Sequence, residues 1–246
     1  MSLQRIFRYR SPDELATSMA GRLVQRIIDL QATRDCVNLA LTSGNTASSM
    51  YAAFGMLAQT PSLDPNRLTL WWSSERYVPT TDPHRNSTLA LSLLARKLSL
   101  VSSNVHPMPS TTGTRDPDEA AYIYATEIGD TIFDICLLGL GRDGHVAAIY
   151  PDHHSLTVQH ETSLLAIGVT DAPVPPLERV TLTLNTINRS SEVWLLATGT
   201  AKADVVARAV QHDPVLPASL VHGAEATYWF LDAAASRRLR YHRCGL

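Results

Sequence analysis

Long hydrophobic runs and a disulfide-forming set of cysteines are both missing from this chain of 246 residues. No apolar stretch approaches the length of a transmembrane helix, so no membrane partner is expected. The segment Met1–Arg10 carries three arginines and no apolar stretch, which argues against a signal peptide. The three cysteines, Cys36, Cys136 and Cys244, are an odd set, which favours reduced structural thiols over a disulfide framework. Together these absences predict a cytoplasmic protein.

An excess of charge of either sign is also missing. The formal net charge is −2, from 21 basic and 23 acidic residues, which gives no reason to expect nucleic acid as a partner. Lysine is scarce, because only Lys97 and Lys202 occur among the 21 basic residues. No serine lies in a Gly-x-Ser-x-Gly elbow, which argues against an ordinary serine esterase.

The chain is long and apolar enough for one large core. With 45% hydrophobic residues, a single α/β domain spanning residues 1–246 is the expected organisation. Strands are expected at Cys36–Leu41, Leu68–Trp72, Val105–Met108, Phe133–Leu138, Leu164–Val169, Glu192–Ala197 and Thr227–Leu231. Helices are expected at Pro12–Leu30, Ala47–Ala58, Arg85–Leu98, Pro117–Ile128 and Ala201–Val210, the first and fourth capped by Ser11 and Asp116. Because strands alternate with helices, the pattern predicts a Rossmann-like, doubly wound, mainly parallel sheet with helices on both faces.

A glycine-rich turn follows the expected buried strand Phe133–Leu138. Its glycines are Gly139, Gly141 and Gly144. They allow a sharp turn and are expected to leave amide N–H groups free to face a ligand. Asp143 and His145 lie two residues apart on this turn, close enough for the carboxylate to orient the ring or to share its ligand. In open α/β sheets such turns lie at the carboxyl ends of strands, where ligands bind, so the segment is predicted to be an active-site loop.

The same glycines also match the dinucleotide fingerprint Gly-x-Gly-x-x-Gly, with Asp171 after the next apolar run as the ribose-binding acid. That fingerprint needs a helix directly after its third glycine, whereas Pro151 and the pair His153–His154 interrupt within two turns. Nicotinamide binding is therefore the minority alternative. His153 and His154 lack a convincing third ligand, so no metal site is expected.

Two earlier loops carry candidate ligand-binding residues. Ser43, Gly44, Asn45 and Thr46 lie between a strand and a helix, where free amides and hydroxyls suit a phosphate or a hydroxyl-rich ligand. A helix cap is the structural alternative for these four residues. Arg76 follows the second strand and, if the neighbouring Glu75 fixes it, could hold an anion or a developing negative charge. The alternative here is an exposed Glu–Arg pair of little energetic weight.

Two later segments place single cations next to strands. Arg179 lies between a proline-rich loop and an apolar run, and Lys202 lies at the start of a helix that follows a strand. A cation at a helix start opposes the helix dipole, so the position of Lys202 favours an anion beside it over a simply solvated lysine.

In their order and spacing, these segments resemble the 6-phosphogluconolactonase family, which is related to the glucosamine-6-phosphate isomerases and deaminases. Thr42–Thr46 approximates the family's Ser-Gly-Gly-Ser/Thr-Thr-type loop, and Trp72–Pro79 is similar to Trp-x-Asp-Glu-Arg-x-Val-Pro. Gly139–Pro151 matches Gly-x-Gly-x-Asp-Gly-His-x-Ala-Ser-Leu-Phe-Pro almost throughout. Pro176–Leu182 and Gly199–Lys202 match the Pro-x-x-Arg-x-Thr-Leu and Gly-x-x-Lys elements. The resemblance runs from about residue 10 to the C-terminus.

Two departures from the family's patterns bear on the activity. Tyr150 stands where the deaminases resemble one another in having an acid and where the lactonase pattern has phenylalanine. Ser74 stands where the second motif has aspartate, which the deaminases use to move a proton between carbons and which bears on how Arg76 is oriented. Without both carboxylates, proton shuttling along a sugar chain is hard to support. Ester hydrolysis needs only one base and one charge stabiliser, so it survives both changes.

The resemblance implies a glucosamine-6-phosphate deaminase-like fold and hydrolysis of 6-phospho-D-glucono-1,5-lactone, a sugar-phosphate lactone of the oxidative pentose phosphate pathway, without metal or cofactor. His145 would act as the general base, Asp143 would orient it or contact substrate, and backbone amides of the glycine turn together with Arg76 would stabilise the oxyanion. The substrate-binding residues implied are Ser43, Gly44, Asn45, Thr46, Gly141, Arg142, Gly144, Arg179 and Lys202. The alternatives are an amino-sugar-phosphate isomerase or deaminase, and a non-catalytic sugar-phosphate sensor of the same fold. Nothing in the sequence demands more than a monomer or a weak oligomer.

Overall fold

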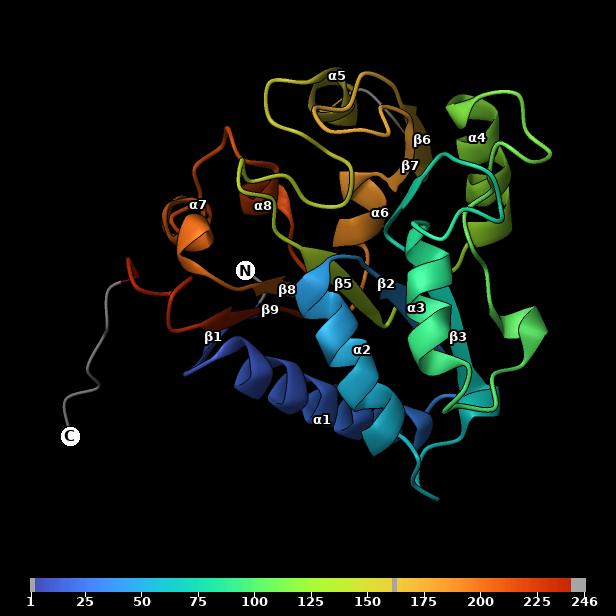
Figure 1. The fold of residues 1–246 in the computed structure, drawn as a ribbon, viewed down its shortest axis with the longest axis vertical. Helices are drawn as coiled ribbons and strands as arrows, with labels where there is room; N and C mark the ends of the chain where they lie inside the picture. Colours follow the sequence, from blue (N-terminus) through green and yellow to red (C-terminus); the bar gives the residue numbers. More distant parts are fainter. Residues whose placement is uncertain (1–2, 161–162, 240–246) are drawn as a thin grey trace.

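The computed structural model describes residues 3–160 and 163–239, and its centre is a sheet of six parallel strands (Figure 1). The strands of this sheet are β1 (Leu3–Tyr9), β2 (Val37–Leu41), β3 (Leu68–Trp72), β5 (Ile135–Gly139), β8 (Glu192–Ala197) and β9 (Ala226–Asp232). They are arranged in the order β1-β9-β8-β5-β2-β3, and every neighbouring pair is parallel. The expected doubly wound, mainly parallel sheet is confirmed. The edge strand β1 was not expected, because its partly exposed, arginine-containing sequence has no buried apolar run.

Helices cover both sides of this sheet. The helices α1 (Pro12–Gln31), α2 (Asn45–Leu57) and α3 (Asn86–Leu94) pack on one another in series, and α1 also contacts β1, β2 and β9. The helices α7 (Ala203–Val210) and α8 (Pro217–Leu220) lie on the other side of the strands from α1 (Figure 1). Ser11 caps α1, because its hydroxyl oxygen accepts the Glu14 N–H at 3.1 Å, as the sequence predicts. Short 3-10 turns occur at Pro65–Arg67, Ser102–Asn104, Val158–His160 and Thr200–Lys202.

A second, antiparallel sheet was not expected. It has the order β4-β7-β6 and consists of β4 (Ser74–Arg76), β7 (Arg179–Leu182) and β6 (Ala166–Val169), with α4 (Pro117–Ile128) packed against it. The apolar run 164–169 was expected in the main sheet, but it contributes β6 to the second sheet. Apolar content alone does not reveal which strand will be a strand's partner. The residues after β7 form α6 (Leu184–Asn188), whose start Thr183 caps. The strand expected at Val105–Met108 is absent, and only one isolated bridge joins Val105 to Leu70.

The order of the main sheet determines where the loops predicted to bind substrate meet. Because β8, β5 and β2 are parallel neighbours, the loops at their carboxyl ends lie side by side. The core beneath them is one contiguous cluster of buried apolar side chains that spans both faces of the sheet. Cys36 and Cys136 are free thiols, and Cys244 lies outside the described residues. In the described part of the chain, no helix is long and apolar enough to cross a membrane.

Candidate active site

The glycine turn after β5 does not have the structure that dinucleotide binding requires. Residues 140–153, all of which are described, contain no helix, and the next helix is α5 (His154–Thr157). The helix that the fingerprint needs after Gly144 is therefore missing. Asp171 follows β6. This strand belongs to the second sheet and does not pair with β5. Neither part of the nicotinamide alternative has the required geometry.

His145 and Asp143 form a hydrogen-bonded pair on this turn. The His145 Nδ1 atom lies 2.6 Å from Asp143 Oδ1, and the same oxygen accepts the backbone N–H of His145 at 3.2 Å. The carboxylate therefore holds the ring with its proton on Nδ1, so Nε2 carries the lone pair of a base. Nε2 has no hydrogen-bond partner among the described residues, and the His145 side chain is 32% exposed. Burial raises the pKa of Asp143, but the hydrogen bond and positive charge of His145 lower it further, which leaves the pKa below its usual range.

The glycines shape this turn instead of offering their amides to a ligand. The Gly139 N–H donates to Thr42 Oγ1 at 3.0 Å, the Gly141 N–H to the His145 carbonyl at 2.8 Å, and the Gly144 N–H to the Gly141 carbonyl at 3.3 Å. The expectation of free glycine amides is wrong, because the turn closes on itself. Gly144 adopts φ +93°, and a Cβ there would lie 2.7 Å from the Leu216 side chain.

A pocket of about 390 Å³ lies where the loops after β2, β5 and β8 meet. It is lined by Ser43, Gly44, Asn45, Thr46, Ala47, Gly139, Leu140, Arg142, Leu196, Ala197, Thr198 and Lys202. The structure thus brings together six of the predicted substrate-binding residues, namely Ser43, Gly44, Asn45, Thr46, Arg142 and Lys202. The sequence did not single out Thr198, whose hydroxyl lies 2.8 Å from that of Thr46.

The electrostatics of this pocket suit an anion. The N-cap of α2 is Gly44 with φ +109°, so the loop supplies the cap position that the structural alternative expects, but no side chain of the loop bonds to the first turn of the helix. The amide N–H groups of Asn45 and Thr46 have no partner in the described residues, and the dipole of α2 is positive at this end. Lys202 donates from Nζ to the Leu140 carbonyl. Burial and the nearby charge of Arg142 lower the pKa of Lys202, and an anion in the pocket would oppose that shift.

The Arg76 guanidinium is not held by Glu75. Its Nη1 donates to the Asn86 side-chain oxygen at 2.7 Å and to the His84 carbonyl. Asn86 in turn donates from Nδ2 to the Ser74 carbonyl at 2.7 Å, so this side chain links β4 to the guanidinium. No sequence pattern singles out Asn86, because it lies ten residues from Arg76 at the start of a helix.

Glu75 instead forms a buried capping site for α3. Its side chain is fully buried and accepts the backbone N–H groups of Asn86 at 2.6 Å and Ser87 at 2.9 Å. It also forms an ion pair with the buried Arg85 guanidinium, with Nη2 and Oε2 3.8 Å apart. Both readings of Glu75 from the sequence, an Arg76-fixing residue and an exposed pair, are therefore wrong.

We expect Glu75→Gln to lower the free energy of unfolding by about 3 kcal/mol, because it leaves the buried Arg85 without its counter-charge and turns an amide NH₂ toward backbone donors. Urea denaturation measures this. Glu119→Gln is the matched control, since Glu119 makes a similar helix-start contact to Arg115 N at 2.6 Å but is partly exposed. The control should lower the free energy of unfolding far less than Glu75→Gln does, and equal losses in the two variants would contradict the prediction.

Arg179 lies opposite Arg76 in the β4–β7 pair and is not among the residues that line the pocket. Its guanidinium donates to the carbonyls of Pro176 at 2.9 Å and Val174 at 3.0 Å. Burial lowers the pKa of Arg179, with a smaller opposing effect from Tyr150. The aromatic ring of Tyr150 lies 4.8 Å from the His145 ring, centroid to centroid. The charges of Arg179 and Arg76 act on Tyr150, and none of these three residues lines the pocket that contains Lys202.

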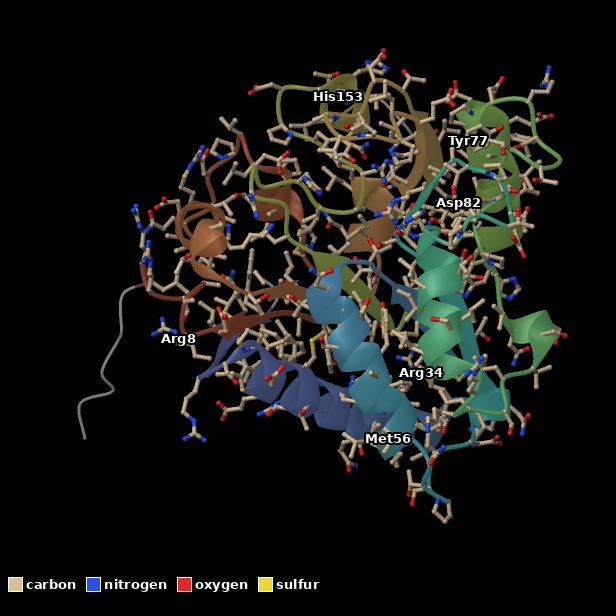
Figure 2. All side chains as sticks on the ribbon, in the orientation of Figure 1. Arg8, Arg34, Met56, Tyr77, Asp82 and His153 are labelled. Carbon is tan, nitrogen blue, oxygen red and sulfur yellow. The ribbon has the colours of Figure 1, made fainter. Side chains whose placement is uncertain are left out.

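His153 supports the loop structure next to this site. Its Nδ1 accepts the Ser155 N–H at 3.0 Å at the start of α5, and its Nε2 lies 3.1 Å from the Thr170 carbonyl. Figure 2 shows His153 near the outer end of the lobe that contains α5 and β6. Among residues 3–160 and 163–239, no group of three or more histidine, cysteine or acidic side chains is placed to hold a metal ion.

Comparison with known proteins gives consistent matches over nearly the whole chain. The family model described as Glucosamine-6-phosphate isomerases/6-phosphogluconolactonase matches residues 10–229. A Streptomyces coelicolor protein named 6-phosphogluconolactonase is 36% identical over 245 residues, which cover 94% of this chain and 93% of that protein. The crystal structure of 6-phosphogluconolactonase from Thermotoga maritima has a TM-score of 0.82 at 26% identity, covering 93% of this chain and 99% of that one. A monomeric glucosamine-6-phosphate deaminase shares the fold alone, with a TM-score of 0.78 at 21% identity and coverage of 96% and 100%.

Proposed function

We infer, because the chain belongs to the glucosamine-6-phosphate isomerase/6-phosphogluconolactonase family, that it is a hydrolase that converts 6-phospho-D-glucono-1,5-lactone to 6-phospho-D-gluconate in the oxidative pentose phosphate pathway. The observation that carries this proposal is the His145–Asp143 pair, which lies beside an anion-suited pocket. A base next to a phosphate site is what hydrolysis of a phosphorylated lactone needs.

The pocket at the ends of β2, β5 and β8 is the proposed site for the 6-phosphate. Lys202 and Arg142 supply positive charge, and the Ser43–Thr46 loop supplies the amides at the start of α2. The family resemblance assigns Arg179 to substrate binding as well. Because the Arg179 side chain donates to carbonyls outside the pocket, we assign it to the side of the substrate that faces Tyr150.

His145 is the proposed general base. Its free Nε2 takes a proton from the water that attacks the lactone carbonyl carbon, and the tetrahedral intermediate forms with negative charge on the former carbonyl oxygen. When the bond from this carbon to the ring oxygen breaks, the imidazolium returns the proton to the ring oxygen. Asp143 stabilises the imidazolium and keeps the ring in the required tautomer. The positive charge of Arg76 stabilises the oxyanion, since the glycine amides are already occupied.

The deaminase alternative lacks the carboxylates that it requires. The two positions identified from the sequence hold Tyr150 and Ser74, and the nearby acid Glu75 is buried under α3, where it caps the helix. No other feature of the site favours movement of a proton between sugar carbons.

The proposal includes the organisation of the whole chain. We assign residues 1–246 to one sugar-phosphate lactonase domain that acts in the cytoplasm as a monomer or weak oligomer. It needs no cofactor, metal or nucleic acid, because the proposed steps use only side chains of this chain.

The experiment that tests this function compares a phosphorylated with an unphosphorylated lactone. With 6-phosphogluconolactone made in situ by glucose-6-phosphate dehydrogenase, the protein should accelerate ring opening well above the spontaneous background. Glucono-1,5-lactone should show about 100-fold lower kcat/KM, because the phosphate contacts help to position the carbonyl.

Lys202→Met supplies the control for this comparison. The variant should lose activity toward the phosphorylated lactone and change little toward the unphosphorylated one. Equal efficiency on both lactones would rule out the phosphate pocket. Tight binding of 6-phosphogluconate without turnover would show that the protein is a sugar-phosphate sensor and not an enzyme.

A further inference from the structure

Tyr150 lies next to His145 in the candidate site. Its residue surface is only 5% exposed, and its ring packs between His145 at 4.8 Å and His153 at 5.7 Å, centroid to centroid. The Tyr150 backbone N–H donates to the buried Ser155 hydroxyl at 3.0 Å, which fixes the residue from behind. Both the ring and the backbone of Tyr150 are therefore held in place before any substrate binds.

The segment that carries Tyr150 lies over one face of the second sheet. In the antiparallel β4–β7 pair, Ser74 lies opposite Thr181 and Arg76 lies opposite Arg179. Side chains two residues apart on a strand, and those directly opposite across a ladder, share a face. The Ala148 N–H donates to the Thr181 hydroxyl at 3.1 Å, so the chain leading to Tyr150 crosses this shared face.

The hydroxyl of Tyr150 is available for a ligand. It forms no hydrogen bond with any residue in the described ranges. It is also not one of the fully buried side-chain atoms that lack a partner, so a ligand can reach it. The charges of Arg179, Asp143 and Arg76 all act on it. A donor that is held rigidly, reaches the site and has no partner in the protein is suited to a hydrogen bond with substrate.

The glycine turn leaves a need for such a donor. The N–H groups of Gly139, Gly141 and Gly144 are bonded within the protein, so they cannot bind the oxyanion without opening the turn. In the family's sequence pattern the position of Tyr150 is phenylalanine and that of Ser74 is aspartate. This chain therefore lacks one carboxylate beside Arg76 and has one additional hydroxyl beside His145.

We propose that Tyr150 is a catalytic residue whose hydroxyl donates a hydrogen bond to the lactone carbonyl oxygen as that oxygen gains negative charge. The inference rests on the proposed lactonase activity and adds a residue to it. Burial raises the pKa of Tyr150, while the two arginines lower it less, so the phenol keeps its proton at neutral pH and remains a donor.

Tyr150→Phe removes only the hydroxyl and leaves the ring that packs on His145. We expect kcat for 6-phosphogluconolactone to fall about 50-fold with KM changed less than about threefold, because the contact strengthens in the transition state and Arg76 remains in place. Tyr228→Phe is the matched control, because Tyr228 is a partly buried tyrosine on β9 whose ring packs against Trp194 at 5.9 Å, outside the site. The control should keep the wild-type kcat, and both variants should keep the wild-type thermal midpoint.

A second readout separates direct contact from an indirect effect. On addition of 6-phosphogluconate, the wild type and Tyr228→Phe should give a tyrosine difference spectrum, and Tyr150→Phe should give none. An active wild type with an unchanged kcat in Tyr150→Phe, or a loss confined to KM, would overturn this inference and leave the lactonase standing. A wild type at the spontaneous background would overturn the lactonase and the inference together.

Discussion

His145→Ala should lower kcat for 6-phosphogluconolactone about 1,000-fold, the largest single loss expected for this protein. The variant removes the proposed general base, which would take the proton from water and return it to the ring oxygen, and such general acid–base steps contribute roughly 10²–10⁴-fold. KM should change little, because His145 does not line the pocket proposed for the phosphate. Steady-state rates with the spontaneous opening subtracted measure both constants.

A second histidine–carboxylate pair supplies a matched control for His145. His106 Nδ1 lies 2.6 Å from Glu127 Oε1, the same separation as in the His145–Asp143 pair, but His106 packs on Trp71 of β3 at the edge of the sheet. His106→Ala should therefore keep the wild-type kcat while it loses some stability. If both variants retained full activity, the base would have to be another group, and the mechanism proposed for the turn after β5 would be wrong.

Removal of the Asp143 charge should cause part of the kcat loss expected for His145→Ala. Asp143→Asn keeps the shape of the side chain but removes the charge that stabilises the imidazolium, so its kcat should lie between those of the wild type and His145→Ala. A wild-type kcat in Asp143→Asn would mean that the 2.6 Å contact orients nothing that the reaction uses.

The parts of the fold that the sequence predicted are those determined by local pattern. The strands Leu68–Trp72 and Glu192–Ala197 and the helix Pro117–Ile128 have their predicted bounds, because an apolar run or a capped start determines each of them locally. The second sheet depends on pairing between β4 and β7, which are about a hundred residues apart, and periodicity within either strand does not reveal that partner.

The same distinction applies to the site. The Ser43–Thr46 loop, Arg142 and Lys202 were predictable as neighbours, because parallel strands place their following loops at one edge of the sheet. Glu75 was misassigned, since its partners Asn86 and Ser87 reach it only through the start of α3. Hydrogen bonds of this kind depend on three-dimensional packing that no spacing rule contains. Tyr150 was noticed only as a departure from a pattern, and its position against His145 is what gives it a proposed role.

Gly141→Ala should lower kcat nearly as much as His145→Ala, although it adds a single methyl group and removes no polar side chain. A Cβ at residue 141 would lie 2.1 Å from His145 Nδ1 and 2.3 Å from Asp143 Oδ1, far inside van der Waals contact. The turn must shift to relieve this overlap, and the His145–Asp143 pair must separate or move with it. We expect about a 500-fold fall in kcat, since misplacement by about 1 Å typically costs 10²-fold and both members of the pair are affected.

Gly21→Ala shows whether this loss comes from the site or from glycine replacement in general. Gly21 lies within α1, and its Cβ would meet nothing nearer than Leu57 Cδ1 at 4.0 Å. That variant should keep full activity and gain up to about 1 kcal/mol in the free energy of unfolding, because alanine favours a helix. A Gly141→Ala protein that folds and turns over at the wild-type rate would show that catalysis does not need the close His145–Asp143 geometry. A folded but inactive one that still binds 6-phosphogluconate would attribute the loss to that pair alone, because the phosphate pocket would then be intact.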